Sequence, residues 1–130
     1  MKRRLRILVL CTLSALATGC AIAPRTPLGV MEMAERPAEK ALLSGIRQYE
    51  DAQYERAEAQ LVGALQTGLA SPRDRAAAYK HLAFIYCASQ RIALCQTAFR
   101  SARQADPAFA LSRSESGHPV WGPVYRQLLP

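Results

Sequence analysis

Residues 38–105 are rich in alanine and repeat apolar residues at intervals of three and four positions. This spacing places apolar side chains along one face of a helix, whereas a half-buried strand would alternate apolar and polar residues. The pattern predicts four amphipathic helices, over residues 38–50, 54–67, 72–88 and 92–105. We therefore expect an all-α fold in which helices are joined by short turns.

Local signals mark where these helices begin and end. Gly68 follows the second apolar run and is the residue type that most often ends a helix. Ser71 can cap the third helix, and Pro72 suits its first position, where the missing N–H has no intrahelical partner. The fourth helix should stop before Pro107, because the residue preceding a proline is pushed out of the helical region.

The third and fourth predicted helices carry a recurring hairpin pattern. The residues that define it are Tyr79, Leu82, Ala83, Tyr86, Cys95, Phe99, Ala102 and Pro107. Their spacing resembles the tetratricopeptide repeat (TPR). A weaker copy upstream places Ala57 38 residues before Cys95, although it departs from the family pattern at Ser44 and Tyr49. The resemblance implies two TPR-like hairpins stacked as an α-solenoid over residues 38–109; a plain four-helix bundle is the alternative.

Two repeats are fewer than the three usually needed to bury a continuous core, so we expect residues 110–130 to cap the open end. Prolines and glycines in this segment exclude one long helix, although a short closing helix over 123–129 fits the sequence. The side chains available for packing on the fourth helix are Phe109, Leu111, Val120, Trp121, Val124 and Tyr125. We interpret Trp121 as a packing anchor; the alternative is an exposed recognition loop over 117–123.

The first 19 residues have the composition of an export signal: a basic start and an apolar run over 7–17, too short to span a bilayer. The run ends in Leu-Ala-Thr-Gly-Cys20, which resembles the lipobox of bacterial lipoproteins, although Ala17 stands where leucine is usual. The resemblance implies removal of residues 1–19 and lipidation of Cys20. With Ala21 next, it implies an anchor on the periplasmic face of a Gram-negative outer membrane. The alternative is an ordinary signal peptide, with Cys20 an incidental thiol.

Removal of residues 1–19 would change the charge of the chain. The full sequence has 17 Lys and Arg against 10 Asp and Glu, a net charge of +7. Four of the basic residues lie in the signal, which leaves 13 − 10, or +3, and no dense basic stripe for a nucleic acid. Residues 20–37 contain three prolines and are interpreted as a flexible tether between the lipid and the domain.

Cys87 and Cys95 remain if Cys11 is lost with the signal and Cys20 is acylated. An even pair in an oxidising compartment favours a disulfide, and the turn between the third and fourth helices would bring the two sulfurs together. Two buried thiols are the alternative, with Cys95 filling a position where alanine is usual. We expect no metal or cofactor, because the two histidines and the cysteines lack metal-ligand spacing.

The TPR resemblance also implies a groove that holds a peptide or partner helix against the first helix of each hairpin. The residues facing it would be Leu42, Leu43, Ile46, Tyr49, Glu50, Lys80, His81, Phe84 and Ala88. Lys80 and His81 resemble part of the polar clamp that some TPR domains use for a terminal carboxylate. A simple solvated helix face is the alternative.

Together these features predict a non-enzymatic adaptor that holds protein partners in an envelope machine. Among such machines we favour a type VI secretion system, with this chain as an accessory lipoprotein. A self-assembling structural lipoprotein, binding a second copy of itself, and an assembly factor for pili or outer-membrane proteins are further hypotheses. An envelope enzyme using Glu115 and His118 is the weakest, because the sequence has no nucleophile motif and neighbouring residues on a loop do not form a triad.

Overall fold

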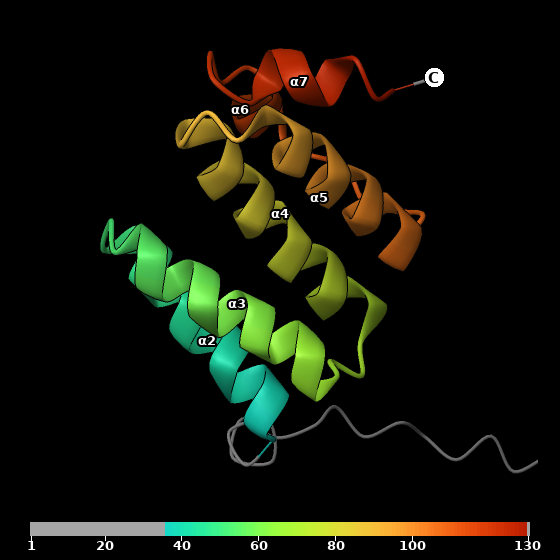
Figure 1. The fold of residues 1–130 in the computed structure, drawn as a ribbon. Coiled ribbons are helices and arrows are strands. Elements are labelled where there is room, and N and C mark those ends of the chain that lie inside the picture. The colour runs from blue at the N-terminus through green and yellow to red at the C-terminus, as the bar shows by residue number, and fades with distance from the viewer. Residues whose placement is uncertain (1–35, 130) are drawn as a thin grey trace, which may run out of the picture.

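The computed structural model describes residues 36–129, and all regular secondary structure in this range is helical (Figure 1). The helices are α2 (Pro37–Glu50), α3 (Tyr54–Thr67), α4 (Pro72–Ala88), α5 (Ile92–Ala105), α6 (Arg113–Ser116) and α7 (Gly122–Arg126). The all-α prediction is confirmed, and the four long helices lie where the sequence places them. The predicted signal, Cys20 and most of the tether lie outside the described residues. Within the described range, no helix is both long and apolar enough to cross a membrane.

The four long helices form two antiparallel hairpins, α2–α3 and α4–α5, related by an offset of 38 residues. Helices α3 and α5 are each 14 residues long, and both ends of α5 lie 38 positions after those of α3. The same offset relates the last residues of α2 and α4, Glu50 and Ala88. The offset between Ala57 and Cys95 therefore extends to the whole of the second helix in each hairpin.

The turns inside the two hairpins have the same backbone conformation. Ala52 and Gln90 occupy equivalent positions and have φ angles of 57° and 60°. The next residues, Gln53 and Arg91, have ψ angles of 64° and 63°. Each turn also repeats its hydrogen bonds: the Gln53 N–H donates to the Gln48 carbonyl, as the Arg91 N–H donates to that of Tyr86. One turn geometry is thus used twice.

The buried residues explain why the helices pack in this order. In α3 they are Ala57, Leu61 and Ala64. The equivalent residues of α5, Cys95, Phe99 and Ala102, are buried at the same spacing, and α5 buries Ala98 as well. One such stripe buries one helix face. Helix α4 instead buries residues around most of its circumference, because it packs against α5 on one side and against α2 and α3 on the other. It is the centre of a single core.

The predicted helix ends are found where the local signals lie. Gly68 has a φ of 102°, in the left-handed region, and ends α3. The Ser71 hydroxyl accepts a 3.4 Å hydrogen bond from the Asp74 N–H and caps α4, with Pro72 at the first position. Asp106 is extended ahead of Pro107 and ends α5.

The C-terminal segment folds back over α5 at the top of Figure 1. Tyr125 of α7 is 4% exposed and belongs to the core, where its ring lies 5.2 Å from that of Phe99. Helix α7 runs from Gly122 to Arg126, shorter than the 123–129 expected. Val120 is 44% exposed, so it does not serve the packing role expected of it. Helix α6 was not predicted.

Candidate functional site

The first helices of the two hairpins, α2 and α4, lie side by side and share a cluster of aromatic rings. The Tyr49 ring lies 5.3 Å from that of His81 and 6.2 Å from that of Phe84. Phe84 also stacks against Trp121 of the C-terminal segment, with ring centroids 4.2 Å apart. The cluster joins the first hairpin, the second hairpin and the C-terminal segment along one face.

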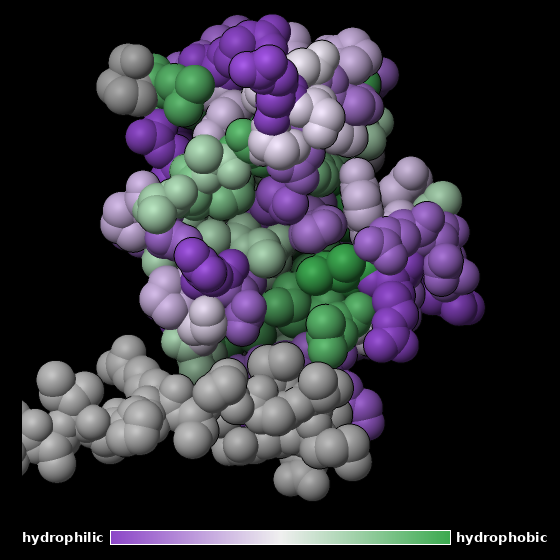
Figure 2. All heavy atoms as spheres, turned by 180° about the vertical axis from the view of Figure 1, so that it is seen from behind, coloured by the Kyte–Doolittle hydropathy of each residue, from purple (hydrophilic) through white to green (hydrophobic). Residues whose placement is uncertain are grey.

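The predicted groove residues divide into an accessible set and a buried set. Leu43 is 46% exposed, and Ile46, Tyr49 and His81 are half-buried. Figure 2 views the molecule from behind Figure 1 and shows apolar surface gathered in the lower half of this side. Leu42 and Phe84 are 5% and 3% exposed, so their side chains support the face from beneath. We name the accessible residues Leu43, Ile46, Tyr49 and His81 the partner face; Glu50 and Ala88 are exposed near the ends of α2 and α4.

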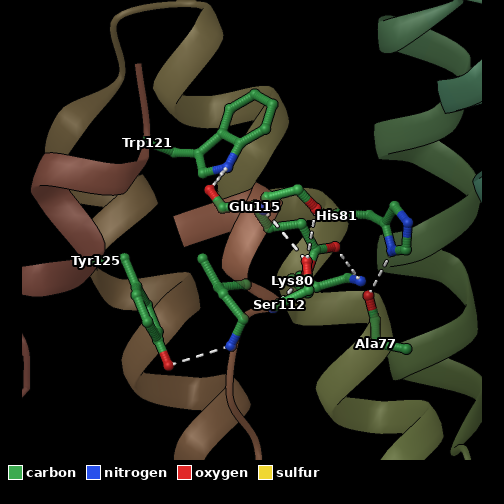
Figure 3. Close-up of polar contacts among 9 residues, drawn as sticks. Ala77, Lys80, His81, Ser112, Glu115, Trp121 and Tyr125 are labelled. Carbon is green, nitrogen blue, oxygen red and sulfur yellow. Dashed lines mark hydrogen bonds and ion pairs between the residues drawn. The ribbon is translucent and has the colours of Figure 1, made fainter. Parts of the chain in front are cut away.

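His81 lies in this cluster as a neutral ring. Burial lowers its pKa below the ordinary value, an effect that the nearby Ala77 carbonyl and the Glu115 carboxylate oppose. The Nδ1 atom lies 2.7 Å from the Ala77 carbonyl oxygen, which can only accept, so Nδ1 carries the proton (Figure 3). A neutral imidazole beside Tyr49 and Phe84 adds apolar surface to the partner face.

Lys80, the cationic residue of the predicted clamp, is already paired within the chain. Its Nζ atom lies 2.7 Å from Glu115 Oε1 (Figure 3). The other Glu115 oxygen accepts from the Ser112 N–H at 2.9 Å, while the Ser112 hydroxyl accepts from the Glu115 N–H at 3.2 Å. Burial acts to raise the pKa of Glu115, but the bonds to Lys80 and Ser112 outweigh it and lower the pKa. The carboxylate is therefore ionised and holds α6 against α4.

Glu115 and His118, the residues named in the enzyme hypothesis, both contact Trp121. The Trp121 indole N–H donates to the Glu115 carbonyl at 2.9 Å, and the Trp121 ring stacks on His118 with centroids 3.4 Å apart. The Val120 N–H donates to His118 Nδ1 at 3.2 Å. In the part of the chain that the structure describes, no three His, Cys, Asp or Glu residues gather where a metal could bind.

Cys87 and Cys95 form a disulfide across the turn between α4 and α5, as predicted. Their Cα atoms are 5.2 Å apart, and both residues are at most 2% exposed. The bond lies inside the second hairpin, so it staples the unit that carries Lys80, His81 and Phe84.

Sequence reasoning missed the contact between Glu115 and Lys80, which are 35 positions apart. A local signal for α6 was present, because Ser-x-x-Glu over 112–115 is a capping box, and both of its reciprocal bonds form. That signal predicts the start of a helix but does not say which cation the carboxylate will meet.

No protein family, functionally characterised protein or solved structure is found to match this chain.

Proposed function

We propose that this chain is a lipid-anchored adaptor of the bacterial envelope, in which two TPR-like hairpins present the partner face to an apolar segment of another protein. In this proposal Cys20 carries the lipid, and the domain faces the periplasm from the outer membrane. No catalytic step is assigned to it. A secretion machine of the type VI class remains the assembly we favour.

The observation that carries the proposal is the partner face itself. Leu43 is exposed on α2 although it is a large apolar residue, and it shares its side of the molecule with a half-buried aromatic cluster. Exposed apolar surface next to aromatic rings is typical of protein-binding sites. The 38-residue repetition of the hairpin supports the TPR-like assignment, because stacked equal hairpins place their first helices on one side.

The contacts of Lys80 narrow the chemistry of the partner. Glu115 engages the ammonium group from within the chain, so an incoming carboxylate would have to displace a bond that is already charge-assisted. The partner face therefore selects its ligand through apolar contacts. This favours the apolar side of an amphipathic helix over a free C-terminal carboxylate.

The test is recovery of partners from detergent-solubilised envelope with the wild-type chain and with Leu43→Glu. A charge at this exposed position should reduce partner recovery about tenfold or more, since desolvating it against an apolar ligand is costly. Ile92→Glu is the matched control: Ile92 is 43% exposed, lies at the start of α5, and is not part of the partner face. Equal recovery with Leu43→Glu and Ile92→Glu would contradict the proposal.

Anchoring is tested separately with Cys20→Ser. If Cys20 carries the lipid, metabolic labelling with a radioactive or alkyne-tagged palmitate should mark the wild-type chain and leave this variant unlabelled. Fractionation of the wild type should place it in the outer membrane. Equal labelling of both chains would remove the lipid anchor from the proposal while leaving the partner face to its own test.

A further inference from the structure

A second apolar surface lies on the side of α4 opposite the partner face. It is a groove of about 400 Å³ between α3 and α5, floored by Tyr79 and Tyr86 of α4. Tyr79 and Tyr86 are seven positions apart and so share one face of α4, while Phe84 is turned to the other. The groove is therefore separate from the partner face, and we call it the α3–α5 groove.

The lining of the α3–α5 groove contains no charged side chain, although 21% of the residues in the chain are charged. Val62 and Leu65 form one wall, and Leu94, which is 47% exposed, forms the rim of the other. Such a groove favours an apolar occupant, because a charged group placed in it would lose water without gaining a partner.

The size of the groove decides between a separate partner and a segment of the same chain. Stable interfaces between separate proteins bury roughly 1,200–2,000 Å² and must offset the loss of translational and rotational freedom. Ten residues line the α3–α5 groove, whereas each side of such an interface contains roughly 20–30 residues. A tethered segment needs much less, because the covalent link gives it a high effective concentration.

The segment just before α2 has the composition and the position to fill the groove. Residues 28–33 read Leu-Gly-Val-Met-Glu-Met, with four large apolar side chains in six positions. The two methionines are unbranched and adapt to an irregular, shallow surface. Its one charged residue, Glu32, can stay in water while its neighbours pack.

The hairpin geometry places the start of α2 close to one end of the groove. Helices α2 and α3 pack antiparallel, so Pro37 lies near the end of α3, where Leu65 lines the groove (Figure 1). Packed helices are about 8–10 Å apart. An extended chain covers roughly 3.3–3.6 Å per residue, so residues 28–33 reach from about 13 to 32 Å beyond Pro37.

From these observations we propose that residues 28–33 of this chain bind intramolecularly in the α3–α5 groove. The bound segment covers Leu94 and Tyr79. It also holds the part of the chain that precedes residue 28 close to the helical domain. The inference is independent of the partner face and of lipidation, since the segment belongs to the chain in either case.

The test is site-specific photo-crosslinking in cells that make the full chain. Leu94 is replaced by p-benzoylphenylalanine, the cells are irradiated, and the reduced adduct is digested with trypsin. We expect an adduct of monomer mass in which the peptide of residues 92–100 is joined to that of residues 26–40. The same probe at Leu43, equally exposed on the opposite side, should capture residues 26–40 at least tenfold less.

A second pair of variants tests the apolar contacts. Val30→Asp combined with Met31→Asp should reduce capture by the Leu94 probe about tenfold or more, while Thr26→Asp should leave it unchanged. Equal capture by the probes at Leu94 and Leu43 would mean that residues 28–33 have no preferred site on the domain, and would overturn the proposal. An adduct of dimer mass would assign the groove to a second copy, and an adduct with another protein would assign it to a partner; either overturns it as well.

Discussion

The two hairpins of this chain share a backbone but are held together by different side chains. Their turns have closely similar φ and ψ angles and equivalent hydrogen bonds. Across the turn, the second hairpin joins Cys87 to Cys95, whereas the equivalent positions of the first are Tyr49 and Ala57. The same turn therefore forms with or without a disulfide across it. In the first hairpin, the position equivalent to Cys87 holds Tyr49, which lies on the partner face.

Phe84 and Ile46 occupy equivalent positions and should differ most in their effect on stability. Phe84 is 3% exposed and contacts rings from both hairpins and from the C-terminal segment, whereas Ile46 is half-buried. Phe84→Ala should cost about 3–5 kcal/mol of unfolding free energy. Ile46→Ala should cost about 1 kcal/mol, because the half-buried Ile46 side chain removes less apolar surface from water when the chain folds. Urea unfolding measures both, and equal losses would show that Phe84 does not join the three units.

The disulfide should stabilise the second hairpin with no counterpart in the first. Closing so short a loop removes roughly 2–3 kcal/mol of unfolded-state entropy by the chain-entropy model. Cys87→Ala combined with Cys95→Ala should lower the unfolding free energy by this amount. A reductant should do the same to the wild type and nothing to the double variant. A double variant as stable as the oxidised wild type would mean that packing alone holds the α4–α5 hairpin.

Close helix approach plays the corresponding part in the first hairpin. A Cβ atom added at Gly45 would lie 2.8 Å from the side chain of Leu61, which is fully buried and has no room to move. Gly45→Ala should therefore cost about 1–2 kcal/mol, because overpacking exceeds the gain in helix propensity. Gly63→Ala, in α3 with open space around it, should stabilise by up to about 1 kcal/mol. Thermal unfolding of the two variants should move in opposite directions.

The helices could be predicted from the sequence because their determinants are local. Apolar spacing, a glycine after α3, a serine before α4 and a proline after α5 act within a few residues of the boundaries they set. The disulfide was predictable for a similar reason, since eight residues separate its cysteines across one turn. The shortening of α7 was not, because its packing against α5 depends on residues far away in the sequence.

The partner face was predictable only in outline. Apolar periodicity places Leu42 and Leu43 on one helix and Phe84 on another, all as candidates for an apolar face. It does not show which of these side chains will be covered by another part of the chain. Trp121 decides this for Phe84 by stacking on it from the C-terminal segment. Likewise, the sequence around Lys80 contains no sign of its ion pair, because Glu115 lies 35 positions away and meets Lys80 only in the folded chain. Contacts of this range depend on the whole fold.

The smallest expected effect tests whether the two turns, which have the same backbone conformation, also contribute equally to the unfolding free energy. Ala52 and Gln90 have φ angles of 57° and 60°, a left-handed conformation that costs a residue with a Cβ roughly 1–2 kcal/mol. Glycine avoids this cost but loses more entropy on folding, so Ala52→Gly and Gln90→Gly should each stabilise the chain by about 0.5–1 kcal/mol. Because the backbone is the same, the two gains in unfolding free energy should be nearly equal by urea titration. A gain at one turn and a loss at the other would show that side chains, rather than the repeated backbone, set the energy of these turns.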